Sequence, residues 1–262
     1  MEPPVPIPNT AVKRFSADDT CGATCRDNRT LPGALLFLHR EVIQSLKNPA
    51  AGTSQSDNFK MDPKFQSMPN IDFQIHDLLA SRWSPRSFDA NKLLDIAVFW
   101  QLIEAARWAP SASNEQPWRF IAGINFNKSH GMILSTLTPG NQEWAKHAPL
   151  LLIAVAKLKK NDTPNKHAFH DVGAALQNLN LEATTIGMHA HLMAGFSPEQ
   201  VRRIFHVPNE FEPITAVAVG YYDHSRPVTD KFKTRDQEKR VRIKGNELVF
   251  SEKWDSPITR QK

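Results

Sequence analysis

The segment PLLLIAVA, residues 149–156, constrains the fold of this chain more than any other stretch. It is an unbroken apolar run of strand length, without the polar alternation of a strand that has one face in water. A strand of this kind is covered on both faces by other elements. The run therefore predicts the central strand of a layered domain.

Helical and strand patterns alternate on both sides of this run. The patterns predict helices over residues 72–82, 91–109, 170–187 and 198–206, strands over 119–124 and 213–222, and a hairpin over 240–250. The alternation continues without an internal repeat from about residue 71 to residue 262. It indicates a single α/β domain over that part of the chain.

Capping and chain-breaking residues set several of these boundaries. The first long helix should end at Pro110, and its broad apolar surface predicts burial on most sides. The second should stop at Gly187, which suits a left-handed cap. Ser197 to Gln200 resembles a capping box with a proline at the first helical position. Gly245-Asn246 predicts the turn of the hairpin.

Charge, apolar content and cysteine content indicate which ligands and which cellular compartment suit the protein. A net charge of +5 and a pI near 9.2 suit a phosphate-bearing small molecule as well as a polyanion. No stretch approaches the roughly 18 apolar residues of a membrane-spanning helix, and the start Met1–Pro4 lacks the layout of a secretory signal. The two cysteines, Cys21 and Cys25, form no familiar metal pattern with His39. We therefore expect a cytoplasmic protein with free thiols.

Residues 1–70 differ in composition and sequence pattern from the rest of the chain. Prolines crowd the start, and NPAAGTSQSDNFKMDPKFQSMPN, residues 48–70, is polar and rich in chain-breaking residues. Only PGALLFLHREVIQSL, residues 32–46, has the pattern of a short helix. Because this extension cannot bury much apolar surface, we expect it to be weakly ordered. Met61 is a candidate alternative start.

Several common catalytic and cofactor motifs are absent from the sequence. There is no G-x-G-x-x-G after a strand, no G-x-x-x-x-G-K-[ST] loop and no H-E-x-x-H. Ser111 and Ser113 lack the strand–turn–helix context of a nucleophilic serine. The pairs His167/His170 and His189/His191 lack a supporting set of carboxylates or cysteines, so we expect no metal site.

Three polar clusters remain as candidate binding elements. The first, SRWSPRSF over residues 81–88, brings Arg82, Ser84 and Arg86 close together, as a phosphate grip would require. The second, APSASNEQPW over 109–118, carries Ser111, Asn114 and Gln116 between two prolines. The third, KFKTRDQEKR over 231–240, carries Lys233 and Arg235. Each cluster alone is typical of a solvated turn or a charged surface tail.

The order and spacing of these clusters resemble the nitroreductase family of flavin enzymes, from about Leu78 to Lys239. The segments GNQEWAKHAPLLLIAVA, DVGAALQNLNLEATTIGM, AGF and VAVGYYD contribute to the resemblance. It implies an α/β (α+β) three-layer sandwich with a mixed, largely antiparallel central sheet flanked by helices, in an interlocked homodimer. It also implies FMN as cofactor, NADH or NADPH as electron donor and an electron-poor acceptor such as a nitroaromatic or a quinone.

The resemblance also assigns cofactor-binding residues. Arg82, Trp83, Ser84 and Arg86 match the segment against the phosphate and ribityl chain, and Lys233 and Arg235 match a later basic pair on the same phosphate. The ring would be reached by Pro110, Ser111, Ala112 and Asn114 of the other protomer, by Ala194 and Gly195 near N5, and by Gln142 at the pyrimidine edge. Arg86 would stabilise negative charge on the reduced ring. No catalytic side chain beyond the flavin is implied.

Three departures from the family pattern bear on these assignments. Trp83 stands where a basic or small residue is more common, Ala112 replaces a common serine, and Ala194 occupies a position that is acidic in some members. The last two remove polar groups that could shape substrate choice.

Other functions remain open at this stage. The same fold hosts dehalogenation, azoline oxidation, enal reduction and flavin cleavage, so the acceptor rests on analogy. A flavin carrier without turnover is a second alternative. A nucleic-acid binder that uses KFKTRDQEKRVRIK, residues 231–244, is a third, although this tail offers a single aromatic residue, Phe232.

Overall fold

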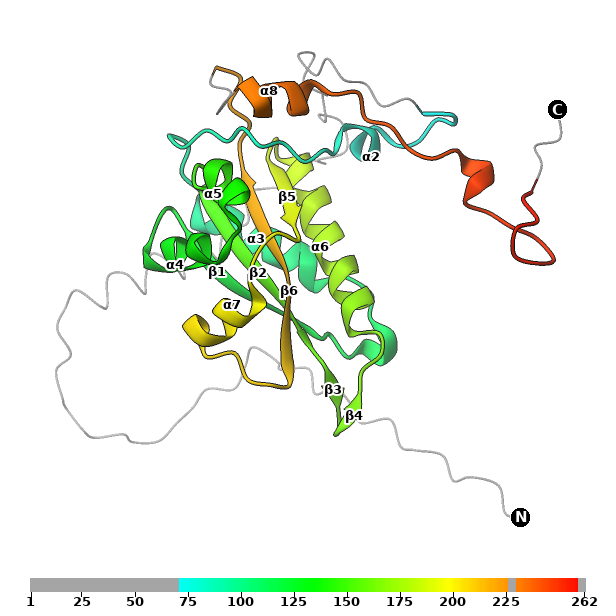
Figure 1. Cartoon of the computed structure of the whole chain (residues 1–262), viewed down its shortest axis with the longest axis horizontal. Coiled ribbons are helices and arrows are strands. Elements are labelled where there is room, and N and C mark those ends of the chain that lie inside the picture. Colours follow the sequence, from blue (N-terminus) through cyan, green and yellow to red (C-terminus); the bar gives the residue numbers. More distant parts are fainter. Residues whose placement is uncertain (1–70, 226–229, 259–262) are drawn as a thin grey trace, which may run out of the picture. The chain divides into compact units, whose positions relative to one another are not determined.

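The structure of the chain is a computed structural model that describes residues 71–225 and 230–258 (Figure 1). The weakly ordered extension predicted over residues 1–70, with Cys21, Cys25 and Met61, lies outside the described residues. The side chains of Lys231 and Lys233 lie outside them as well.

One four-stranded sheet forms the centre of the domain, in the order β1-β2-β6-β5. Its strands are β1 (Trp118–Ile124), β2 (Leu150–Lys157), β5 (His189–Met193) and β6 (Phe211–Gly220). The first seven residues of β2 are buried, so the predicted central strand is confirmed. A two-residue pair, β3 (Lys159–Lys160) with β4 (Thr163–Pro164), extends one end of the fold.

The prediction of a mixed, largely antiparallel sheet is confirmed in its antiparallel part. No parallel pair occurs among the described strands, because every neighbouring pair is antiparallel. The physical reason lies in the connection from β2 through α6 (Ala168–Thr185) to β5. Both strands run antiparallel to β6, so they point the same way, as a helical crossover requires. However, β6 lies between them and takes the hydrogen bonds of both.

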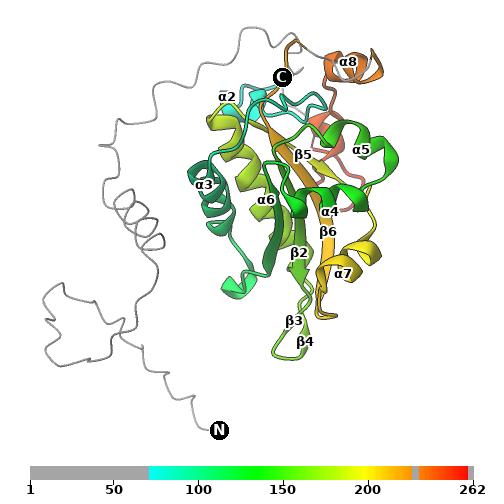
Figure 2. The ribbon, with the colours of Figure 1, turned by 90° about the vertical axis from the view of Figure 1, so that its left-hand side faces the viewer.

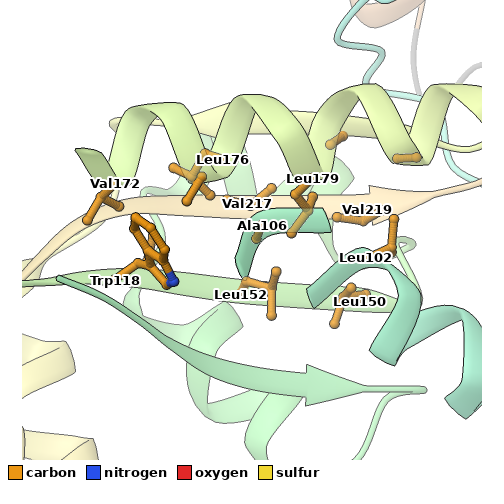
Figure 3. Packing of buried hydrophobic residues seen from close by; sticks show 14 of the residues in the cluster. Leu102, Ala106, Trp118, Leu150, Leu152, Val172, Leu176, Leu179, Val217 and Val219 are labelled. Carbon is orange, nitrogen blue, oxygen red and sulfur yellow. The ribbon is translucent and has the colours of Figure 1, made fainter. Parts of the chain in front are cut away.

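Helices cover both faces of the sheet, which confirms the three layers (Figure 2). Leu150 and Leu152 of β2 face a core shared with α6 and α3 (Ile96–Arg107), shown in Figure 3. Leu151 and Ile153 face the opposite core. That core is closed by α4 (Lys128–Thr136), α5 (Pro139–Ala145) and α7 (Pro198–Phe205). Alternate residues of one strand thus serve two cores, because successive strand side chains point to opposite faces.

The helix predicted over residues 91–109 is α3, but it is shorter and less buried than expected. It begins at Ile96 because the Asp95 carboxylate accepts the Ala97 N–H at 2.7 Å and caps it. Only Phe99, Leu102 and Ala106 are buried. Trp100 is 61 % exposed, so burial on most sides is wrong for the single chain. The sheet and α6 cover one stripe of α3 and leave the other uncovered.

Two other predicted boundaries are confirmed, and one predicted helix is shorter than expected. Helix α6 ends at Thr185, two residues before Gly187, which adopts a left-handed φ of 73°. The Ser197 hydroxyl accepts the Gln200 N–H at 3.2 Å and caps α7. The helix predicted over residues 72–82 is present as the shorter α2 (Asp77–Ser81).

The C-terminal hairpin prediction is wrong. Helix α8 (Asp230–Gln237) is followed by irregular chain, and Gly245 begins a short 3-10 helix, η3 (Gly245–Glu247). The Leu248 N–H donates to the Gly245 carbonyl at 3.1 Å, so the chain continues past the glycine instead of reversing into a paired strand. The bridge that does form joins Phe250 to Pro257.

None of the helices within 71–225 and 230–258 is both long enough and apolar enough to span a membrane.

Candidate functional site

Two basic segments that lie about 150 residues apart in sequence meet beside α2 and α8 (Figure 1). The Arg86 N–H donates to both carboxylate oxygens of Asp236, at 3.1 and 3.0 Å. The Arg240 guanidinium donates to the Arg82 carbonyl at 2.9 Å. We call the group Arg82, Ser84, Arg86, Arg240 and Arg242 the basic end of the domain.

The guanidinium groups of the basic end repel one another. Burial and the charge of Arg242 lower the pKa of Arg82 below its usual value. Burial lowers the pKa of Arg240 as well, and the charges of Arg82 and Arg242 lower it further. Like charges held this close gain stability when an anion binds between them. The donor set therefore fits a phosphate, to which Arg offers paired N–H groups.

Arg240 and Arg242 were missed by the sequence prediction, which selected Lys233 and Arg235 instead. Arg235 is exposed on α8, and Lys233 belongs to the same helix. The signal that could have found the missed pair is their spacing. Alternate residues of an extended segment point to the same side, so Arg240 and Arg242 can act together. The roles assigned to Lys233 and Arg235 stay predictions.

His191 of β5 connects the sheet to the first basic segment. Its Nδ1–H donates to the Pro85 carbonyl at 2.8 Å. Burial, reinforced by the charges of Arg86 and Arg82, lowers the pKa of His191 to about 4, so the ring is neutral at pH 7. The other side of the ring meets Trp144 of α5, with ring centroids 4.5 Å apart. His191 thus joins the basic segment to α5.

Trp83 packs inward rather than toward a ligand. Its side chain is buried, and its ring lies 5.6 Å from His189 and 5.2 Å from Tyr222, centroid to centroid. This packing accounts for an aromatic residue where the family more often carries a small or basic one. A contact from residue 83 to a cofactor would have to come from its main chain.

Ala194 and Gly195 lie where β5 meets α5. The Gly195 carbonyl accepts the Thr138 N–H and the Asn141 side-chain amide, both at 3.0 Å. A Cβ on Gly195 would lie 2.6 Å from the Asn141 Nδ2 atom and 2.9 Å from the Thr138 Oγ1 atom, so a larger residue would force these two side chains to move. Gln142 is on the same helix and donates from Nε2 to the Leu137 carbonyl at 2.7 Å. The structure therefore brings Gln142 and Gly195 to one junction.

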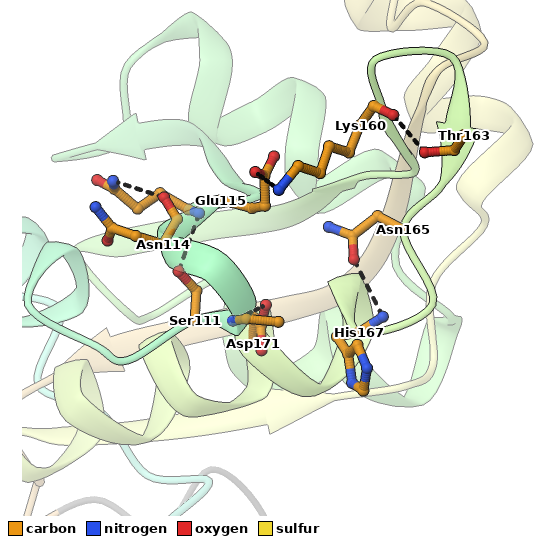
Figure 4. Close-up of polar contacts among 10 residues, drawn as sticks. Ser111, Asn114, Glu115, Lys160, Thr163, Asn165, His167 and Asp171 are labelled. Atoms are coloured by element: carbon orange, nitrogen blue, oxygen red, sulfur yellow. Dashed lines mark hydrogen bonds and ion pairs between the residues drawn. The ribbon is translucent and has the colours of Figure 1, made fainter. Parts of the chain in front are cut away.

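The predicted ring-contacting strip lies at the other end of α6 (Figure 4). The Ala112 N–H donates to the buried Asp171 carboxylate in the first turn of α6, at 3.1 Å. Trp83, by contrast, packs on His189, four residues after the last turn of α6. The helix has 18 residues, which is about 27 Å of length at 1.5 Å per residue. One chain therefore does not bring the strip and the basic end together.

The strip has an unusual main-chain conformation. Ser113, Asn114 and Gln116 have left-handed φ values of 51°, 55° and 48°. The Gln116 N–H donates to the Ser111 hydroxyl at 3.1 Å, and Glu115 forms an ion pair with Lys160 at 2.5 Å. Pro110, Ser113, Asn114 and Gln116 are exposed. Left-handed non-glycine residues persist only where their surroundings hold them, and they cluster at functional sites.

Two further features lie apart from these residues. A cavity of about 450 Å³ between Phe205 of α7, Phe120 of β1 and Phe211 of β6 contains none of the predicted site residues. Within the part of the chain that the structure describes, no group of three His, Cys, Asp or Glu side chains could hold a metal ion.

Comparison with protein families gives one match over more than half of the chain. Residues 79–125 and 122–221 match the family described as "Nitroreductase family". Among curated proteins, an NADH dehydrogenase/NAD(P)H nitroreductase of Archaeoglobus fulgidus, a name given provisionally, is 27% identical over 148 residues, 55% of this chain and 83% of the relative. An uncharacterized 15.4 kDa protein of Mycolicibacterium smegmatis is 29% identical over 125 residues, 48% of this chain and 84% of the relative.

Solved structures give the same result. The crystal structure of an oxidoreductase containing FMN is 29% identical, superposes with a TM-score of 0.67 and covers 72% of this chain and 96% of its own. A nitroreductase family protein of Clostridium difficile 630 is 22% identical and shows the same fold, with a TM-score of 0.54 over 69% of this chain and 99% of its own.

Proposed function

This chain belongs to the nitroreductase family, and we propose that it is an FMN-dependent oxidoreductase that passes electrons from NADH or NADPH to an electron-poor acceptor such as a nitroaromatic or a quinone. The observation that carries the proposal is the convergence of Arg82, Arg240 and Arg242 at the end of the domain where Pro85 meets β5. The FMN in the similar crystal structure supports the choice of cofactor.

The basic end fits the phosphate of FMN in both charge and geometry. A phosphate monoester carries about −1.5 to −2 charges at pH 7. It would offset the repulsion that lowers the pKa values of Arg82 and Arg240. The Ser84 hydroxyl already lies 3.3 Å from the Arg82 guanidinium, so both groups can donate to one phosphate. We assign the phosphate to Arg82, Ser84, Arg240 and Arg242.

The other proposed cofactor-binding residues at this end of the chain would orient the ring system. Gly195 leaves room for the Asn141 and Thr138 side chains, and Gln142 lies on the helix that Gly195 contacts. The Arg86 guanidinium is 27% exposed, and its ion pair with Asp236 is 3.8 Å long, beyond hydrogen-bond distance. Its N–H groups therefore remain able to donate to a ligand. FMN, when bound, supplies the chemistry that takes electrons from NAD(P)H and gives them to the acceptor. The chain contributes binding, orientation and the positive charge of Arg86.

A complete site would need a second copy of this chain. The strip from Pro110 to Asn114 lies at the far end of α6 from the basic end, so a partner would have to supply it. The uncovered stripe of α3 offers a surface for that partner, because Ile96 and Trp100 are 58% and 61% exposed. Exposed apolar residues between Val241 and Trp254 would add to an interlocked contact. We therefore propose a homodimer with shared sites.

Placing a charge on the exposed stripe of α3 tests the dimer. Trp100→Glu should convert the dimer to a monomer and lower FMN affinity at least about tenfold, because a buried unpaired charge costs several kcal/mol. Light scattering after size exclusion and FMN titration measure the two effects. Gln200→Glu adds the same charge on the exposed face of α7, in the opposite layer, and should change neither. A dimeric Trp100→Glu protein would place the interface elsewhere.

The function itself is tested with the purified full-length protein. We expect a yellow protein, or a colourless one that turns yellow with FMN, and steady NADH or NADPH oxidation only when a nitroarene or quinone is present. A protein that binds FMN without turnover would be a flavin carrier. A protein that neither retains nor takes up FMN would refute the proposed function.

A further inference from the structure

One peptide group in the first basic segment is held at both ends by polar side chains, one half-buried and one buried. The carbonyl of the Pro85–Arg86 peptide accepts the Nδ1–H of His191 at 2.8 Å. The N–H of the same peptide donates to both carboxylate oxygens of Asp236. His191 belongs to β5 and Asp236 to α8, so two separate elements hold one peptide plane. We call this arrangement the peptide clamp.

Both side chains of the clamp are firmly seated. The Asp236 side chain is 2% exposed and also accepts a main-chain hydrogen bond from Ser87. The His191 ring packs on Trp144, whose side chain is almost fully buried at 1% exposure. Rotation of the peptide would turn its carbonyl toward the Asp236 carboxylate, where two acceptors would meet without a proton. The peptide therefore has one stable orientation.

The clamp determines how Ser84 and Arg86 are placed relative to each other. Their relative position depends on the two main-chain dihedrals of Pro85. The proline ring fixes φ near −65°, and the clamped peptide fixes ψ. The main chain of Ser84 and Arg86 thus keeps a constant relative position before any ligand binds. Preorganisation of this kind raises affinity because less conformational freedom is lost on binding.

We propose that His191 is a positioning residue, which acts through the Pro85–Arg86 peptide to hold Ser84 ready for the phosphate end of the cofactor. The proposal rests on the assignment of FMN to this site. It does not place His191 in contact with the cofactor. Because the phosphate end is affected, loss of the clamp should weaken FMN more than riboflavin, which has the same ring and ribityl chain but no phosphate.

His191 tests the clamp more cleanly than Asp236. Removal of the Asp236 carboxylate would break the clamp and also remove a negative charge near the proposed phosphate, and these two effects oppose each other. The His191 ring is neutral at pH 7, since its pKa is lowered to about 4. Its replacement by another neutral side chain changes the hydrogen bond and leaves the charge of the site unchanged.

The experiment compares three variants with the wild type in titrations with FMN and with riboflavin. His191→Leu has no donor. Asn can place its amide N–H near the position of Nδ1, whereas the amide of Gln reaches further, toward the position of Nε2. We expect His191→Leu and His191→Gln to bind FMN about tenfold more weakly and riboflavin within about twofold of wild type. His191→Asn should recover FMN affinity to within about threefold.

The results separate the clamp from the proposed function. A wild-type protein that does not bind FMN would refute both. If the wild type binds FMN, an unchanged FMN-to-riboflavin affinity ratio in His191→Gln would overturn the clamp. Equal loss in His191→Asn and His191→Gln would overturn it too, because the position of the donor would not matter. If His191→Leu does not fold, the comparison of the Asn and Gln variants decides.

Discussion

Replacement of Arg82 and Arg240 together by glutamine should weaken FMN binding at least about 100-fold and leave the apo-protein about as stable as the wild type. A hydrogen bond to a charged group contributes about 1.5–3 kcal/mol, so two such donors account for a loss of this size. The free energy of unfolding of the apo-protein should change little. Both guanidiniums are partly buried among like charges, which already lowers their pKa values. Their removal relieves repulsion and desolvation, which offsets the lost bond from Arg240 to the Arg82 carbonyl.

Fluorescence quenching of FMN by the apo-protein measures the affinity, and thermal unfolding without FMN measures the stability. The expected change in Tm is below about 4 °C, which corresponds to about 1 kcal/mol for a domain of this size. Arg203→Gln is the matched control, because Arg203 is exposed on α7 in the opposite layer. It should leave both quantities unchanged. Near-normal FMN affinity in the double variant would remove the basic end from the phosphate site.

Local patterns predicted the layers of this fold well. The apolar run over residues 149–156 became β2, buried along almost its whole length between two cores. Ser197 and Gly187 set the helix boundaries that their side-chain chemistry predicts. These features depend on interactions within a few residues or on burial alone, and both are recorded in the sequence pattern. Local patterns do not predict the order of the strands. The placement of β6 between β2 and β5 depends on contacts between residues that lie far apart in sequence.

The candidate site was predicted only in part, for the same reason. Arg82, Ser84 and Arg86 form a compact motif, and the structure keeps them together. The resemblance assigned the second basic pair to Lys233 and Arg235, whose roles stay predictions. The structure instead brings Arg240 to the Arg82 carbonyl. Several basic residues in such a segment could be matched to the phosphate, and only the tertiary contact shows which of them lie near Arg82.

The uncovered face of α3 shows a limit of another kind. Its broad apolar pattern predicted burial on most sides, yet Trp100 is 61% exposed in the single chain. A sequence pattern records how much apolar surface must be covered, and it does not record whether the cover comes from the same chain. The proposed dimer would resolve this difference, since a second copy would cover the stripe that α6 and the sheet leave open.

Gly123→Ala should destabilise the domain by about 3 kcal/mol. Gly123 lies in β1 where α4 crosses the sheet, and a Cβ there would lie 2.3 Å from the Cα and 2.4 Å from the main-chain N of His130. These are main-chain atoms, so no side chain can rotate away and α4 itself must move. The movement would also strain the buried hydrogen bond between His130 Nε2 and the Ala148 carbonyl, now 2.9 Å.

The same substitution on the helix should have the opposite effect. Gly131 is exposed on α4 and a Cβ there meets nothing within 4 Å. Gly131→Ala should therefore stabilise the domain by about 0.5–1 kcal/mol, because alanine loses less main-chain entropy in a helix. For a domain of this size, Gly123→Ala should lower the Tm by roughly 6–12 °C and Gly131→Ala should raise it slightly. Equal Tm values for the two variants would mean that α4 does not rest against β1 at Gly123, and the layer that contains α5 and its contact with Gly195 would need to be placed differently.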